Sequence, residues 1–339
     1  MSASSCNWSR AVGPTDVDYA PDDSATLYLQ ARRSLAVGED QEALETLLEL
    51  VERDEVHLEG HILYQDLARR LGGGTASTMG RYYDELRDDG SAAVPYLKSR
   101  LKGPGGRSDL LRVAIERDEG LHYAYLDLAE IWDQEGETER ALEAAIRASE
   151  AAPNDPQVNL RLARSLEATG RAKDAAERYR RYLAAMPGDL PVFETYLRLT
   201  LYSLGDIEAA REVLSRLETA RGADDPDLRL HRAALLWRTG DLDGARDIYR
   251  VLLRSDPLES RAVLNLANSY YLSDQRSEDE KRAEWPKARR IYRYYLSLSS
   301  RGEIGDLLDS TLTVPSRIAR IDEFLGPDPD PSLPTVEDL

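Results

Sequence analysis

Few side chains in this sequence could do chemistry, and their spacing argues against a catalytic or metal centre. His57 and His61 are four residues apart, so they could share a helix face and bind zinc. Gly60 stands between them and the HExxH pattern is absent, so we expect no metal site. The glycine runs at 72–74 and 103–106 lack the Lys-Ser/Thr pair of a phosphate-binding loop. Without a GxSxG motif either, we expect no enzyme and no cofactor.

The single cysteine, Cys6, excludes an intrachain disulfide and leaves two alternatives open. The run Ala3-Ser4-Ser5-Cys6 is of the kind that precedes the lipidated cysteine of bacterial lipoproteins, but the basic start and apolar stretch of such a signal are missing. Either the protein is cytoplasmic as written, or its true start lies upstream and Cys6 carries lipid. In the second case the protein would be a periplasmic or outer-membrane lipoprotein, with residues 7–23 as a tether.

Charge and hydropathy narrow the classes of partner. The 339 residues include 44 basic and 62 acidic side chains, which give a net charge of −18 and argue against nucleic acid as a ligand. No apolar run approaches the length of a membrane-spanning helix, so membrane contact would depend on lipidation at Cys6. Segment 281–295 is locally basic and rich in aromatic residues; we interpret it as a helix with a solvated basic side.

A periodic pattern of small residues indicates the elements that position the polar groups. Five glycine–alanine pairs have the same five-residue spacing, and the last four recur after 34, 35 and 35 residues: Gly38/Ala43, Gly136/Ala141, Gly170/Ala175, Gly205/Ala210 and Gly240/Ala245. Around Gly136, the apolar face of Leu128, Ala129 and Trp132 predicts a first helix whose apolar residues are buried, and Ala141 begins the stripe of a second. Glycine suits the turn between the two helices because it tolerates positive φ. The sequence therefore predicts a series of helical hairpins.

This repeat resembles the tetratricopeptide repeat family. The match is close over 122–155 and 156–189, fair over 226–259 and weaker over 191–224, where Arg198 stands at a small-residue position. The resemblance implies an all-α, right-handed superhelical solenoid of helical hairpins. It also implies a non-enzymatic scaffold that binds a protein or peptide rather than a small-molecule substrate.

We expect four regions along the chain. Residues 1–23 form a flexible N-terminal segment, and residues 24–302 form the repeat array, which is clearest over 122–259. Residues 303–325 form C-terminal capping helices. Residues 326–339, with four prolines and four acidic side chains, form a disordered tail.

The first helices of such hairpins line a concave face, where a partner peptide or helix would bind. Tyr202, Trp237 and Tyr271 recur about one repeat apart and predict an aromatic ladder with Trp237 as its anchor. Several of the aliphatic residues on this face could instead pack against neighbouring first helices. The residues predicted to bind the partner are Tyr123, Glu130, Arg164, Leu199, Tyr202, Leu230, Trp237, Arg261, Asn268 and Tyr271.

Three functions fit this interpretation. The first is a protein-interaction scaffold with a partner in the concave groove. The second is a lipoprotein of the same repeat family in the bacterial envelope, which would assist assembly or secretion of a surface structure. The third is a self-associating structural protein whose groove is filled by its own chain.

Overall fold

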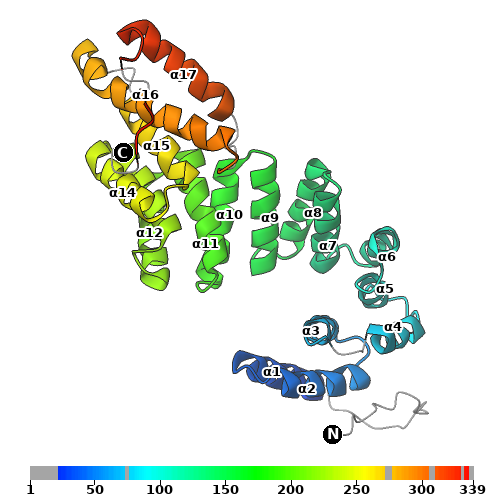
Figure 1. Ribbon diagram of the computed structural model, residues 1–339. Coiled ribbons are helices and arrows are strands. Elements are labelled where there is room, and N and C mark those ends of the chain that lie inside the picture. Colours follow the sequence, from blue (N-terminus) through cyan, green and yellow to red (C-terminus); the bar gives the residue numbers. More distant parts are fainter. Residues whose placement is uncertain (1–21, 73–75, 272–276, 305–309, 330–331, 336–339) are drawn as a thin grey trace. The chain divides into compact units, whose positions relative to one another are not determined.

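The structure is a computed structural model that describes residues 22–72, 76–271, 277–304, 310–329 and 332–335 (Figure 1). The secondary structure of these residues is helical, with no strand among them. Cys6 and residues 7–21 of its proposed tether lie outside the described residues, whereas Asp22 and Asp23, the last two residues of the expected flexible segment, begin helix α1. The chain separates into two compact units, Met1–Ser165 and Leu166–Leu339. The expected all-α solenoid of helical hairpins is confirmed.

In the first unit, consecutive helices pack as hairpins, most extensively α1 with α2, α5 with α6 and α7 with α8. Helix α9 begins in this unit and ends in the second. The helices are α1 (Asp22–Ala36), α2 (Asp40–Arg53), α3 (Leu58–Arg70), α4 (Ala76–Glu85), α5 (Ala93–Ser99), α6 (Pro104–Arg117), α7 (His122–Gln134), α8 (Thr138–Ala151) and α9 (Pro156–Ala168).

The second unit continues the alternation of first and second helices and adds a long helix, α16, that packs on α15 and α17. One first helix, α11, continues into a π-helix, η1. The elements are α10 (Ala172–Ala185), α11 (Leu190–Arg198), η1 (Leu199–Leu204), α12 (Ile207–Arg221), α13 (Pro226–Arg238), α14 (Leu242–Ser255), α15 (Ser260–Tyr271), α16 (Glu278–Ser300) and α17 (Ser310–Leu325).

The glycine–alanine pairs have the turn and close-contact roles that their spacing predicts. The five glycines have φ between +65° and +90° at the turns inside the hairpins, a conformation that costs glycine little because it has no Cβ. The five paired alanines are fully buried. A side chain this small lets the two helices of a hairpin approach closely. Trp132, which we expected to be buried with Leu128 and Ala129, is only half-buried, and the Arg140 guanidinium lies 4.7 Å from the centroid of its ring.

Enlarging one of these alanines is expected to destabilise the array. Ala175 in α10 has no exposed surface, so Ala175→Leu would overpack the hairpin and lower the free energy of unfolding by about 1–3 kcal/mol. Ala184→Leu adds the same atoms on the exposed side of α10 and serves as the control. Urea unfolding followed by circular dichroism measures both. Equal stability of the two variants would contradict the close approach assigned to Ala175.

The start of the C-terminal tail is ordered, contrary to our expectation of disorder over 326–339. Asp328 is only 8% exposed, because its carboxylate pairs with Arg289 at 3.0 Å and with Arg293 at 2.5 Å. The Gly326 carbonyl accepts a hydrogen bond from Arg289 Nη1 at 3.0 Å. Composition could not predict this, since the partners of the acidic tail are arginines on α16, more than 30 residues away. In the described part of 303–325 the expected capping helices are one helix, α17.

Candidate protein-binding surface

The exposed side of the first helices in the second unit carries a mixed aromatic and charged patch. It comes from α11, η1, α13 and α15, and we refer to it as the first-helix surface. Its exposed and partly exposed residues are Glu194, Arg198, Tyr202, Asp227, Trp237, Arg238 and Arg261, and we include His231, which is 7% exposed, because it contacts Tyr202.

The π-helix sets the register of this surface. Fifteen residues separate Leu190, the start of α11, from Gly205, whereas fourteen separate the start of α7, α9 or α13 from its turn glycine. The wider turn of η1 accommodates the extra residue. A residue of α11 before η1 therefore occupies the repeat position that a count back from Gly205 assigns to the residue after it: the register of α11 differs by one residue from that count.

This shift explains why the prediction for Leu199 is wrong. Counting back from Gly205 placed Leu199 on the exposed face, but Leu199 is 3% exposed and packs inside the unit. Arg198, which seemed to replace a small core residue, is exposed instead, and fully buried Leu197 takes the core position. The first-helix surface thus gains a cation that the sequence pattern had assigned to the interior.

Tyr202 is the exposed aromatic residue at the centre of the first-helix surface. Its side chain emerges from η1 and is 46% exposed. The Tyr202 hydroxyl shares a hydrogen bond with His231 Nδ1 at 3.0 Å, and the two rings lie 5.7 Å apart. Burial lowers the pKa of His231 below its usual value, which favours the neutral imidazole. Arg238 Nη2 donates to the Tyr202 carbonyl at 3.3 Å, so Tyr202 is held at both its backbone and its hydroxyl.

The cations of this surface differ in their partners. Arg261 is neutralised within the unit, because its guanidinium contacts Asp227 at 2.9 Å and Glu259 at 3.0 Å. The Arg198 guanidinium is exposed and makes no hydrogen bond or ion pair with any residue that the structure describes. Arg198 therefore has all its guanidinium donors available for a partner, and Arg238 uses one of its donors for the Tyr202 carbonyl.

Three further predicted residues are not on the exposed surface. Leu230 is 5% exposed and packs in the core of the second unit, as the alternative interpretation allowed. Tyr271 is 8% exposed, with its ring 5.4 Å from Trp285 and 5.9 Å from Tyr292. The Asn268 carbonyl oxygen already accepts hydrogen bonds from Tyr292 at 2.6 Å and from Arg317 at 2.5 Å.

The predicted aromatic ladder is therefore wrong as a continuous exposed row. Trp237 is half-buried and packs against the core cluster, Tyr271 is inside that cluster, and only Tyr202 is widely exposed. The cause is the far end of the chain: α16 and α17 supply Trp285, Tyr292 and Arg317, which cover the last first helix. The repeat pattern could not show this packing, because it joins α15 to helices that follow the last matched repeat.

The remaining predicted residues belong to the first unit, on α7 and α9. Tyr123 is half-buried, with its ring 3.9 Å from that of His122 and 6.1 Å from that of Tyr96. The Glu130 carboxylate lies 3.7 Å from the Arg107 guanidinium. Arg164 is exposed. The structure leaves a binding role for these three residues as a prediction.

The two neighbouring histidines have structural roles. His57 caps the start of α3, where its Nδ1 accepts a hydrogen bond from the Gly60 amide at 3.1 Å. His61 is fully buried and shares hydrogen bonds with the Tyr83 hydroxyl at 2.8 Å and the Asp54 carbonyl at 2.9 Å. In the described ranges, no group of three or more histidine, cysteine, aspartate or glutamate residues is arranged to hold a metal ion.

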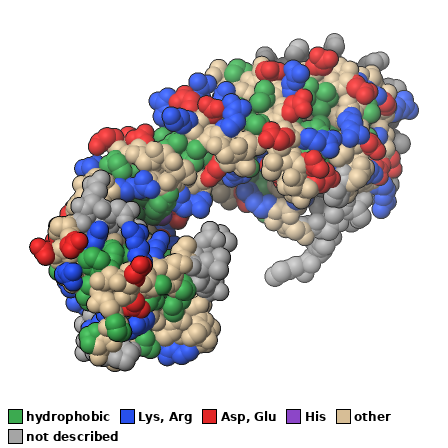
Figure 2. Space-filling view, turned by 90° about the horizontal axis from the view of Figure 1, so that it is seen from above, with side chains coloured by type: hydrophobic (Ala, Val, Ile, Leu, Met, Phe, Trp, Pro, Cys, Tyr) green, Lys and Arg blue, Asp and Glu red, His purple; other side chains and the backbone are tan. Residues whose placement is uncertain are grey.

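No large patch of a single charge dominates the visible surface. Figure 2 shows acidic and basic side chains interspersed over the face that it presents, with small apolar areas between them. Within the described residues, no helix is long and apolar enough to cross a membrane.

Two family models, both described as tetratricopeptide repeat, match residues 134–197 and 199–260. These two segments of the chain are tetratricopeptide repeats (TPR). The matches cover the hairpins from α8 to α14, including the hairpin that contains η1.

Several solved structures resemble this chain. The APC/C heterotetramer Cut9–Hcn1 matches with a TM-score of 0.51 and 13% identity over 90% of this chain and 57% of that chain. MamA from Desulfovibrio magneticus RS-1 matches with a TM-score of 0.44 and 15% identity over 54% of this chain and 97% of that chain. YrrB, titled a TPR protein with an unusual peptide-binding site, has a TM-score of 0.43 and 18% identity over 56% and 93%. No curated protein matches the sequence.

Proposed function

We propose that this TPR protein is a non-enzymatic scaffold that binds a segment of a partner protein on its first-helix surface. The observation that carries the proposal is the exposure of Tyr202, which the π-helix places beside His231 and unpaired Arg198. Tyrosine and arginine are the residue types that most often dominate binding energy at protein interfaces. A π-turn inside a helix is frequent at functional sites, which adds to the argument.

The chemistry of the surface indicates the kind of segment that would bind. Arg198 offers a fork of donors suited to a carboxylate, while the ring of Tyr202 and the exposed part of Trp237 offer apolar contact. Arg261 is already paired with Asp227 and Glu259, so it would add little net charge. We therefore infer a partner segment that combines an acidic residue with an aromatic or aliphatic one.

Site-specific photo-crosslinking tests this proposal. A benzophenone side chain at position 202 is expected to crosslink one partner in cells of the source organism, and Arg198→Glu in the same chain is expected to remove that product. Val251, which is 39% exposed on the second helix α14, is the control position and should not yield the same product. Mass spectrometry of the crosslinked species identifies the partner.

Two results would count against this function. If position 251 captures the same partner as strongly as position 202, the binding surface lies on the second helices. If the product at position 202 is a second copy of this chain, the protein self-associates through the first-helix surface and the structural alternative is favoured. Circular dichroism of each variant checks that the fold is retained.

A further inference from the structure

A second site lies on the other helix layer, away from the first-helix surface. A pocket of about 390 Å³ opens where α14, α15 and α16 meet, and its wall includes Pro334 from the described C-terminal segment 332–335. The lining residues are Arg250, Tyr270, Pro286, Lys287, Arg290, Ile291 and Pro334. Three of the seven are cations, in a protein whose net charge is −18.

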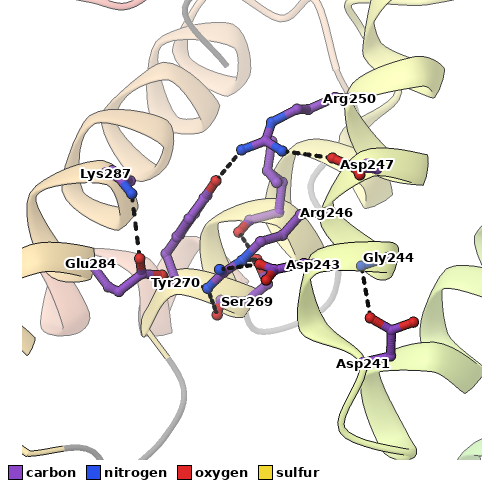
Figure 3. A network of polar contacts seen from close by, with 11 residues as sticks. Asp241, Asp243, Gly244, Arg246, Asp247, Arg250, Ser269, Tyr270, Glu284 and Lys287 are labelled. Atoms are coloured by element: carbon purple, nitrogen blue, oxygen red, sulfur yellow. Dashed lines mark hydrogen bonds and ion pairs between the residues drawn. The ribbon is translucent and has the colours of Figure 1, made fainter. Parts of the chain in front are cut away.

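Two of the three cations are held against one tyrosine ring, as Figure 3 shows. Arg250 donates a hydrogen bond to the Tyr270 hydroxyl and a second to Asp247 at 3.0 Å. The Lys287 ammonium lies 5.3 Å from the centroid of the Tyr270 ring and 3.3 Å from the Glu284 carboxylate. An aromatic ring flanked by fixed cations can contact an apolar group and a carboxylate at the same time.

The third cation, Arg290, differs from the other two. It makes no ion pair with the described residues, and its buried Nε has no hydrogen-bond partner. A buried donor without a partner costs about 1–3 kcal/mol, so an acceptor that reached it would be favoured. Arg290 therefore marks the pocket as a place for an anionic group.

The pocket is built on a rigid base. Arg246, almost fully buried beneath it, donates to Ser269 Oγ at 3.2 Å and to the Ser269 carbonyl at 2.9 Å (Figure 3). Its guanidinium also pairs with Glu284 at 2.5 Å and lies 4.0 Å from the centroid of the Tyr270 ring. These contacts join α14, α15 and α16, so the pocket is preorganised before anything binds in it.

A C-terminal segment of the chain itself lies at this pocket. Asp328 is fixed to α16 by its pairs with Arg289 and Arg293, and Pro334 follows only six residues later. Glu337 and Asp338 come three and four residues after Pro334, a reach of at most roughly 14 Å in an extended chain. A proline followed by two carboxylates complements a tyrosine ring and three cations.

We propose that this pocket is a binding site for an acidic segment that follows a proline, and that the protein's own residues 332–339 are its occupant. Pro334 packs at the wall, and the carboxylates of Glu337 and Asp338 pair with Arg290, Lys287 and Arg250. Residues 336–339 lie outside the described part of the chain, so the pairing of their carboxylates is what the experiment tests. The site is independent of the first-helix surface and would be present if that surface bound nothing.

Competition between the tethered segment and a free copy of it tests the proposal. The probe is a fluorescein-labelled peptide with the sequence of residues 331–339, and binding is measured by fluorescence anisotropy. A tethered segment competes at an effective concentration of about a millimolar, so the full wild-type chain should bind the probe weakly. Glu337→Lys with Asp338→Lys should displace the tether and tighten probe binding by about tenfold or more.

Two further variants, both made in the Glu337→Lys/Asp338→Lys chain, locate the site. Lys287→Gln with Arg290→Gln should abolish probe binding, because it removes two of the three cations without adding repulsion. Arg211→Gln, an exposed arginine on α12 of the same unit, should leave binding unchanged. Hydrogen exchange of α14 to α16 in each variant confirms that the fold is kept.

Each alternative result overturns the proposal. Equal binding of the probe to the wild-type chain and to the tail variant means that the tail does not occupy the pocket. Binding that survives Lys287→Gln/Arg290→Gln lies elsewhere, and absence of binding to every variant shows that the pocket takes no such peptide. A wild-type dimer that becomes monomeric in the tail variant, seen by sedimentation, assigns the occupant to a second copy.

Discussion

Replacing Arg289 by methionine is expected to lower the free energy of unfolding of the second unit by about 3–5 kcal/mol. The Arg289 side chain is 4% exposed and pairs with Asp322 at 2.7 Å and with Asp328 at 3.0 Å. Methionine fills similar space but removes one of the guanidinium partners of the buried Asp328 carboxylate. The Gly326 carbonyl also loses its donor. The large cost arises because the variant takes a compensating positive charge away from a carboxylate that stays buried.

Urea unfolding compares Arg289→Met with Arg301→Met, which removes an exposed arginine near the end of the same helix. The control should change stability by less than about 1 kcal/mol, as surface ion pairs do. Because repeat arrays can unfold unit by unit, hydrogen exchange should locate the loss in α16 and α17. A change for Arg289→Met no larger than that of the control would show that Asp328 and Asp322 are solvated.

Acid is expected to destabilise the first unit through His61. Burial lowers the pKa of the His61 imidazole to about 4, from 6.5, despite its hydrogen bond to the Asp54 carbonyl. The folded state therefore binds this proton less readily than the unfolded state does. The contribution of neutral His61 to the free energy of unfolding is fully present above pH 6.5 and is lost as pH falls from 6.5 towards 4. Its size is about 3 kcal/mol, since one pKa unit corresponds to about 1.4 kcal/mol.

The measurement is urea unfolding of the wild type and of His61→Gln between pH 7.5 and pH 4. Glutamine does not titrate, so the variant should lose less stability across this range than the wild type does. The difference between the two slopes isolates His61 from the other groups that titrate with it. Parallel pH profiles of the two proteins would mean that His61 is protonated in the folded state as easily as in the unfolded one.

The repeat pattern predicted the hairpins because their turns and close contacts depend on residue type alone. Gly205 needs a positive φ and Ala210 needs a small side chain, and both requirements are visible in the sequence. The register of the first-helix surface was not visible, since a 35-residue step does not say where the extra residue is placed. In the 170–205 step the extra residue lies in η1, and in the 205–240 step it lengthens α12 to 15 residues. Only the first of these changes which side chains are exposed.

The repeat pattern also could not predict the contacts that join distant parts of the chain. Tyr271 is buried by Trp285 and Tyr292, and Asp328 is held by α16, because tertiary packing decides exposure once a helix has neighbours. Arg198 is the instructive case: its position in the repeat suggested a core residue, while its charge suggested the surface. The charge was the better guide, because an unpaired arginine is almost never buried.

Hydrogen exchange of the complex with the partner found by crosslinking tests the central claim most directly. The account predicts that binding slows exchange of the amides in η1 and at the exposed side of α13, around Tyr202 and His231. It also predicts that Arg198→Glu abolishes this protection without altering exchange in the free protein. Protection confined to α12 and α14, with η1 unchanged, would contradict the assignment of the first-helix surface as the binding site.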